Sequence, residues 1–248
     1  MSNLEGVYWD LDGTIANTEL EAHLPAFNKA FEALALSWYW DENTYIDLLK
    51  INGGKNRIAF YANLKNQKFT KEFITKIHLE KQKHYLSLVK DGAVTLKDGV
   101  NRLVNELKIK EVRQFIVTSS SRIQVTLLVD LLFGDKHPFE FFISSEDVDL
   151  HKPHPLPYQK AMFLSGIKNS NSIVFEDSIP GVKSAISAKL PTICVKSNIP
   201  TYFDKDIYLK CLVDSLGDGK NFSKVITGPL LNGKYINYEY LVKFLNNY

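Results

Sequence analysis

The sequence predicts an α/β fold, in which a doubly wound parallel sheet (Rossmann-like core) carries an inserted helical cap domain. Short apolar, β-rich runs alternate with helical segments, as in a parallel sheet that is covered by helices on both faces. The first run is separated from the second by a long stretch of helical spacing, too regular for a loop. We therefore expect a discontinuous core of residues 1–17 and 93–248 and a helical cap of residues 18–92.

The predicted strands are short runs rich in β-branched and aromatic residues. They cover residues 7–9, 115–117, 139–143, 173–175 and 192–195. Helices are expected at residues 100–107, 125–133, 157–165 and 181–188. Within the cap, Leu24, Phe27 and Phe31 are spaced three and four residues apart, as one helix face requires, and no strand is expected there.

Composition excludes several classes of protein. The chain has 248 residues, of which 45% are hydrophobic and 23% charged, as in an ordinary globular protein. A formal net charge of +2 gives no electrostatic case for nucleic acid or an anionic membrane as partner. Cys194 and Cys211 lie too far apart for a metal knuckle and are too few for a disulfide framework, which favours a reducing cytoplasm. Without a signal-like or membrane-spanning run, we expect a cytoplasmic protein. We also expect a monomer.

Polar residues follow four of the predicted strands, at the edge where open α/β sheets bind their ligands. The first strand ends in Asp10-Leu11-Asp12-Gly13-Thr14. Side chains two residues apart on an extended chain point the same way, so both carboxylates can face one site. Two such charges need a cation or a proton between them. The alternative is a pair of loop aspartates that cap the next turn.

The second and third strands are followed by candidate phosphate ligands. Ser119 has a hydroxyl and a backbone N–H for a phosphoryl group, although serine-rich strand ends are also common turns and helix caps. Lys152 lies in a loop stiffened by Pro153, Pro155 and Pro157, which would hold its ammonium in place, although most lysines are solvated.

Two acids, Glu176 and Asp177, end the fourth apolar strand. Carboxylates in such a place suit Mg²⁺, which takes one or two carboxylates, several waters and a substrate phosphate oxygen. The alternative is that Asp177 caps the helix that follows.

Together, and in this order, the four clusters resemble the motifs of the haloacid dehalogenase superfamily, and the position of the insert resembles the cap of its β-phosphoglucomutase-like branch. This resemblance implies Asp10 as nucleophile, Asp12 as general acid and then base, Ser119 as phosphoryl ligand and Lys152 as neutralising cation. It also implies Mg²⁺ bound by the Asp10 carboxylate, the Asp12 backbone carbonyl, Asp177 and Glu176. Gly13, Thr14 and Ser120 are expected to contact the substrate, and Thr118 is an alternative to Ser119.

The cap is expected to read the rest of the substrate. In Gly53-Gly54-Lys55-Asn56-Arg57, Gly54 allows close approach of the backbone, and Lys55 and Arg57 could hold a second phosphate. A plain helix start with solvated basic side chains is the alternative. The cap segment from Leu36 resembles that of CbbY-type phosphatases, which remove phosphate from xylulose 1,5-bisphosphate, an inhibitory by-product of the carbon-fixing carboxylase. The resemblance implies this small phosphorylated sugar as substrate.

Three rival functions share some of these features. A β-phosphoglucomutase-type mutase would have the same site but a longer-lived phosphoenzyme. A receiver-type signalling module also uses carboxylates, a hydroxyl and a lysine, but in a shorter chain without a helical insert. A phosphosugar-binding module without turnover would more easily have lost Asp10, Asp12, Lys152 or Asp177, and all of these are present.

Overall fold

The computed structural model describes residues 3–51, 53–197, 199 and 209–248. The chain divides into two compact units. One comprises Met1–Asn17 and Leu96–Tyr248, and the other comprises Thr18–Thr95. The second boundary therefore falls at Leu96, not at residue 93 as the sequence analysis placed it. We refer to the two as the core unit and the cap unit.

The core unit is built on a seven-stranded sheet with the order β3-β2-β1-β4-β5-β6-β7. Its strands are β1 (Gly6–Trp9), β2 (Arg113–Val117), β3 (Phe139–Ile143), β4 (Ser172–Glu176), β5 (Thr192–Val195), β6 (Leu212–Val213) and β7 (Val225–Thr227). Neighbouring strands from β3 to β6 are parallel. The doubly wound fold is thus confirmed. The edge strand β7, which was not among the predicted strands, pairs antiparallel with β6. Strands β6 and β7 are too short to show the alternation of apolar and polar residues by which a strand is recognised in a sequence.

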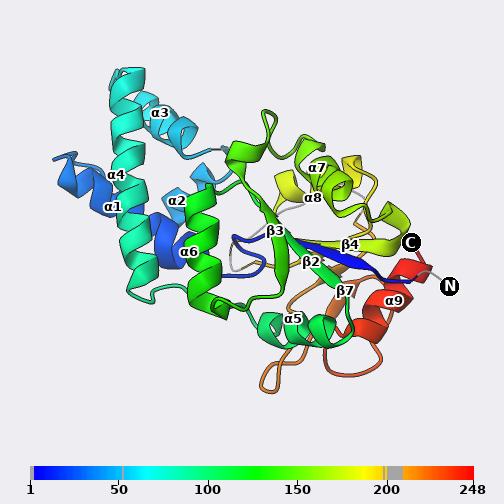
Figure 1. The fold of residues 1–248 in the computed structure, drawn as a ribbon. Helices are drawn as coiled ribbons and strands as arrows, with labels where there is room; N and C mark the ends of the chain where they lie inside the picture. Colours follow the sequence, from blue (N-terminus) through cyan, green and yellow to red (C-terminus); the bar gives the residue numbers. More distant parts are fainter. Residues whose placement is uncertain (1–2, 52, 198, 200–208) are drawn as a thin grey trace. The chain divides into compact units, whose positions relative to one another are not determined.

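Helices cover both faces of this sheet. They are α5 (Val100–Ile109), α6 (Arg122–Phe133), α7 (Leu156–Ser165), α8 (Ile179–Ser187) and α9 (Tyr238–Asn246). In Figure 1, α7 and α8 lie above the strands, and α5 and α9 lie below them and contact each other. Helix α9 is an addition to the predicted elements.

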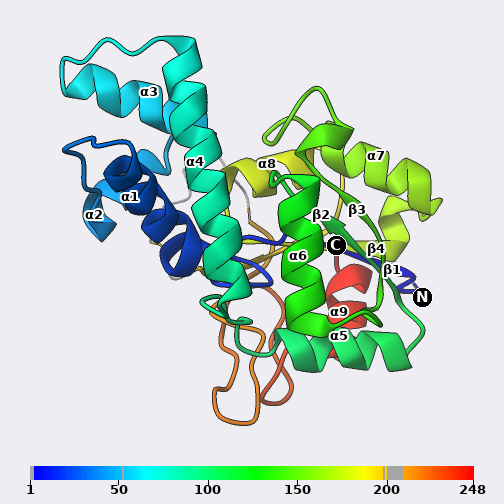
Figure 2. The same ribbon diagram turned by 60° about the vertical axis from the view of Figure 1, so that its left-hand side comes forward.

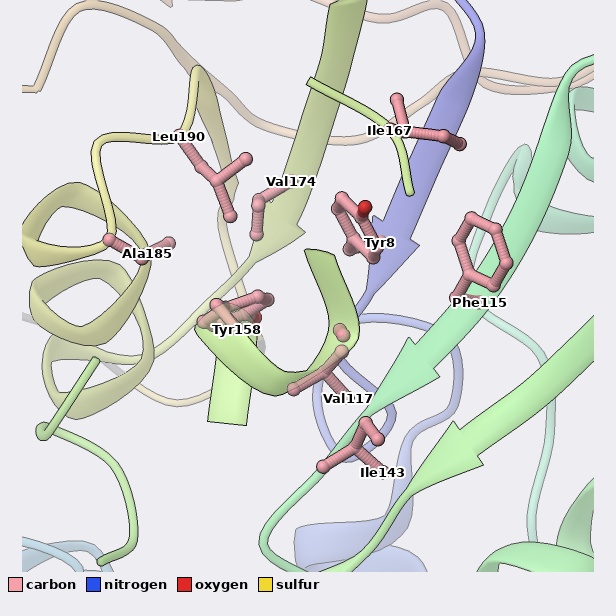
Figure 3. Packing of buried hydrophobic residues seen from close by; sticks show 11 residues of the cluster. Tyr8, Phe115, Val117, Ile143, Tyr158, Ile167, Val174, Ala185 and Leu190 are labelled. Atoms are coloured by element: carbon pink, nitrogen blue, oxygen red, sulfur yellow. The ribbon is translucent and has the colours of Figure 1, made fainter. Parts of the chain in front are cut away.

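Every residue of β1, β4 and β5 is buried. Because successive side chains of a strand point to opposite sides, both faces of these strands are covered. Figure 3 shows Tyr8 and Val174 of the strands packed with Tyr158 of α7, in one buried cluster. Towards the opposite face, Trp9 stacks on Phe175 with ring centroids 4.4 Å apart. These contacts fix β1 between β2 and β4, which carry the polar residues described below.

The cap unit is helical. It contains a π-helical turn η1 (Glu19–His23) and the helices α1 (Leu24–Ala33), α2 (Glu42–Leu48), α3 (Gly54–Leu64) and α4 (Lys71–Lys90). In Figure 2, α1 lies alongside α4, and the two contact each other extensively. The hydrophobic core of this unit is largely aromatic and includes Phe27, Phe31 and Trp40. Throughout the described part of the chain, no helix combines the length and hydrophobicity that crossing a membrane requires.

Candidate active site

The polar residues of the core unit converge at the carboxyl ends of three adjacent strands. Asp10 follows β1, and its amide donates to the Phe175 carbonyl of β4 at 3.0 Å. Thr118 follows β2, and Glu176 ends β4. Strand order reverses between β1 and β4, and such switch points are where doubly wound sheets bind ligands. Four separate sequence motifs therefore meet in one place, because the loop that carries Lys152 also reaches it.

The ammonium of Lys152 connects three elements of this site. Its Nζ donates to Asp10 Oδ1 at 2.7 Å and to Glu176 Oε1 at 2.6 Å. The third acceptor is the Val117 carbonyl, at 2.8 Å. Three acceptors match the three N–H donors of an ammonium. Burial disfavours the charge, but Asp10 and Glu176 outweigh it and raise the pKa of Lys152, so the side chain stays protonated.

The carboxylates around Lys152 carry more negative charge than its ammonium balances. Burial, and then repulsion from Glu176, raise the pKa of Asp10 well above its ordinary value in spite of Lys152. Asp10, Glu176 and Asp177 are all buried and each offers an oxygen within 4.8 Å of the others. A compact set of oxygen ligands with excess negative charge fits a hard divalent cation such as Mg²⁺.

Gly13 and Thr14 belong to the surroundings of Asp177. A Cβ on Gly13 would lie 2.1 Å from Asp177 Oδ2, and its φ of +85° also favours glycine. Thr14 Oγ1 donates to Asp177 Oδ1 at 3.4 Å. Gly13 and Thr14, which the sequence analysis assigned to substrate contact, therefore lie against Asp177, the residue that follows β4.

The carboxylate of Asp12 has different partners from that of Asp10. Its Oδ2 accepts hydrogen bonds from Ser120 Oγ at 2.6 Å and from Thr118 Oγ1 at 3.4 Å. Over the described residues, the group that could hold a metal contains Asp10 but leaves out the Asp12 side chain. The Asp10 carboxylate therefore lies among the possible metal ligands, whereas the Asp12 carboxylate is held by hydroxyl groups.

The two candidate hydroxyls of the second motif, Thr118 and Ser119, lie in different surroundings. Thr118 is buried, with 3% exposed, and also accepts the Ser120 N–H at 3.0 Å. The Ser119 side chain is exposed. The reason is the strand: the Thr118 amide still pairs with the Ile143 carbonyl, at 2.9 Å, so Ser119 is the first residue beyond the ladder.

Tyr158 is a site residue that the sequence analysis missed. Its hydroxyl donates to Glu176 Oε1 at 2.6 Å from a fully buried position in α7. A tyrosine in an apolar helix gives no sequence signal for such a contact, which depends on how α7 packs on the sheet.

A cluster of basic side chains in the cap unit includes Lys81 and His78, which the sequence analysis missed. Lys81 is 4% exposed, and its Nζ lies 2.5 Å from His23 Nδ1. Burial, and then the charges of Lys81 and Lys55, lower the pKa of His78 to about 4. Lys81 Nζ also lies 4.8 Å from the centroid of the Tyr85 ring. The sequence could have revealed this cluster, because the spacing of His78, Lys81 and Tyr85 places them on one face of α4.

The predicted residues at the start of α3 have structural contacts of their own. A Cβ on Gly54 would lie 2.8 Å from the His78 ring, so this glycine permits close packing of α3 on α4. Arg57 Nε donates to the Ile51 carbonyl at 3.0 Å, and Lys55 is exposed. Close approach at Gly54 therefore serves the helix packing, whereas its expected contact with substrate stays a prediction.

Comparisons with known proteins agree with this geometry. Residues 7–195 match the family model described as haloacid dehalogenase-like hydrolase. Protein CbbY of Rhodobacter capsulatus is 33% identical over 198 residues, which cover 78% of this chain and 86% of that protein. A CBBY-like protein of Arabidopsis thaliana is 30% identical and covers 92% of this chain and 75% of its own length.

Two solved structures are also similar. A crystal structure of CbbY from Rhodobacter sphaeroides in complex with phosphate has a TM-score of 0.78 and 30% identity, covering 86% of this chain and 94% of that one. A mutant of the same enzyme, in complex with xylulose-(1,5)bisphosphate, has a TM-score of 0.76 at the same identity and coverage.

Proposed function

The chain belongs to the haloacid dehalogenase-like hydrolase family and is a phosphatase, and from this premise we propose its substrate and mechanism. The proposed reaction is the Mg²⁺-dependent hydrolysis of xylulose 1,5-bisphosphate to xylulose 5-phosphate and phosphate, through an aspartyl-phosphate. The observation that carries the chemistry is the Lys152 ammonium, which bridges Asp10 and Glu176 beside a compact group of carboxylates. Similarity to an enzyme crystallised with xylulose bisphosphate supports the substrate.

In the proposed mechanism the two aspartates of the first motif divide the work. A carboxylate oxygen of Asp10 attacks phosphorus, and Asp12 gives its proton to the departing sugar oxygen. Asp12 then takes a proton from the water that attacks the aspartyl-phosphate, which releases phosphate and restores Asp10. The covalent intermediate divides one hard displacement into two. The Ser120 hydroxyl, which donates to Asp12 Oδ2 at 2.6 Å, orients Asp12 for both proton transfers.

The remaining residues are proposed to stabilise charge on the transferring group. Lys152 and Thr118 would bind phosphoryl oxygens, since phosphoryl transfer depends mainly on positioning and on neutralising oxygen charge. The carboxylates of Asp10, Asp177 and Glu176, together with the Asp12 backbone carbonyl, would hold Mg²⁺. When bound, the ion supplies positive charge to those oxygens and to Asp10.

We expect Mg²⁺ to stabilise the protein more at neutral than at acidic pH. The pKa of Asp10 is raised in the folded state, so without metal the free energy of unfolding falls as pH rises from about 4 through that raised pKa. At neutral pH, Mg²⁺ at a concentration of 100 times its Kd should raise the free energy of unfolding by about 2.7 kcal/mol. Urea unfolding with MgCl₂ and with EDTA measures this. The Asp177→Asn variant should lose the metal effect, and equal stabilisation of that variant would contradict the assignment.

Thr118→Val and Ser119→Ala are matched deletions of adjacent hydroxyls. Because Thr118 is buried beside Asp12 and Ser119 is exposed, we expect kcat to fall about 30-fold in the first and less than about 2-fold in the second. Steady-state phosphate release measures both. The opposite ranking would return the phosphoryl contact to Ser119.

Lys55→Ala and Arg57→Ala test the proposed second phosphate contact in the cap. Loss of a charge-assisted contact should raise KM for the bisphosphate about 10-fold for each residue, with kcat nearly unchanged. KM for a sugar monophosphate should not move. Lys65→Ala, which removes another cap lysine placed over the Tyr61 ring, is the control. Equal rises of KM for both classes of substrate would contradict recognition of a second phosphate.

The substrate itself is tested by phosphate release, with and without Mg²⁺, from a panel of sugar phosphates. The panel is xylulose 1,5-bisphosphate, ribulose 1,5-bisphosphate, β-glucose 1-phosphate and phosphoglycolate. The account predicts a metal-dependent preference for the xylulose compound. Preference for another member of the panel would contradict the proposed substrate but not the proposed phosphatase reaction. Conversion of β-glucose 1-phosphate without net release would replace the phosphatase by a mutase.

A further inference from the structure

We propose that Tyr158 is a positioning residue of the catalytic site, which fixes Glu176 so that Glu176 in turn holds Lys152 against Asp10. This inference rests on the proposed function, since it requires Lys152 to neutralise the transferring phosphoryl group.

The hydroxyl of Tyr158 and the ammonium of Lys152 meet on a single oxygen. Tyr158 and Lys152 each donate to Glu176 Oε1 at 2.6 Å. An ordinary phenol has a pKa of about 10, so the hydroxyl is protonated at neutral pH and can donate. Glu176 is 0% exposed, and a carboxylate removed from water requires donors of this kind.

The ring of Tyr158 also contacts the lysine. Lys152 Nζ lies 5.1 Å from the ring centroid, within the range of a cation–π interaction. Figure 3 shows the ring beside Val174 and Val117 of the sheet, and it belongs to the same buried cluster. Core packing therefore fixes the ring, and with it the hydroxyl that reaches the polar site.

The other side of Glu176 is confined as well. Its Oε2 lies 3.4 Å from Ser178 Oγ, and a Cβ on Gly181 would come within 1.9 Å of that oxygen. Glu176 is thus enclosed between α7 and the start of α8. Without the Tyr158 hydroxyl, Oε1 would depend on Lys152 alone and draw the ammonium away from Asp10. Removing a single phenolic oxygen should therefore weaken catalysis without removing any group that touches the substrate.

Tyr158→Phe tests this role, with Tyr8→Phe as the matched control. Tyr8 belongs to the same hydrophobic cluster, is equally buried, and its hydroxyl bonds to Ser165 Oγ at 2.6 Å, away from the carboxylates. Both variants should lose a similar amount of stability. We expect kcat to fall about 10-fold only in Tyr158→Phe, with KM within about 2-fold of wild type.

Coupling to Glu176 gives a second readout. If Tyr158 acts through Glu176, the loss of kcat in Tyr158→Phe with Glu176→Gln should be much smaller than the product of the two single losses. Equal kcat in Tyr158→Phe and Tyr8→Phe, or multiplicative losses, would overturn the role in an active enzyme. A wild-type protein that releases no phosphate would instead overturn the proposed function, and this role with it.

Discussion

Asp10→Asn is expected to lower kcat at least about a thousandfold while the protein remains folded. The amide keeps the shape of the side chain and an oxygen that can accept from Lys152, but it cannot form the phosphoenzyme. The change also removes the charge that Glu176 repels, so the free energy of unfolding without metal should differ by only about 1 kcal/mol from wild type.

Phosphate release and urea unfolding should be measured on the same preparations of this variant. Asp218→Asn is a suitable control, because Asp218 is a loop carboxylate outside the site that accepts from the Lys220 and Asn221 amides. It should leave kcat within about 2-fold of wild type. An Asp10→Asn protein that kept more than about 1% of kcat would contradict the assignment of the nucleophile.

Lys152→Met is expected to affect activity and stability together. Loss of the ammonium leaves Asp10 and Glu176 buried without their counter-charge, which costs about 3–5 kcal/mol of stability at neutral pH. It also removes the cation proposed for the phosphoryl oxygens, so kcat should fall about a thousandfold.

The pH dependence of Lys152→Met follows from the same charges. Without the lysine, which lowers the pKa of Asp10, the folded-state pKa of this acid rises further above its unfolded value. Carboxyls with raised pKa values lose stability as pH increases, so the variant should regain part of its stability between about pH 7 and pH 4. Metal-free urea unfolding across this range tests the sign.

Lys83→Met is the control for Lys152→Met. Lys83 forms an exposed ion pair with Glu80 at 2.8 Å, and such pairs contribute little. Its removal should change stability by less than about 0.5 kcal/mol at any pH. A Lys152→Met protein as stable as this control, or one that lost stability on acidification more steeply than wild type, would contradict the charge balance inferred for the site.

The fold was predictable where local pattern and burial agree. Strands β1 to β5 each contain at least three consecutive apolar residues, as expected for a sheet covered by helices on both faces. Strands β6 and β7 have two and three residues and carry no period. Helix α9 had a readable signal in the spacing of Leu241, Phe244 and Leu245, which the sequence analysis did not use.

The sequence was enough to predict which strand ends form the site, but not which hydrogen bonds the side chains form there. Asp10, Lys152 and Glu176 were placed together because the carboxyl ends of parallel strands share one edge. The choice between Thr118 and Ser119 depends on where β2 leaves the ladder, which residue type does not reveal. The contact from Tyr158 to Glu176 joins α7 to β4 and arises only from tertiary packing.

The most direct test of the account is chemical identification of the phosphorylated residue. Wild-type protein mixed with Mg²⁺ and xylulose 1,5-bisphosphate is quenched rapidly in acid and reduced with borohydride, which converts an aspartyl-phosphate into homoserine. Peptide mass spectrometry then reads the residue. The account predicts homoserine at position 10, dependent on substrate and metal and lost in Asp10→Asn. Phosphate release accompanied by a phosphate adduct on any other residue would contradict it.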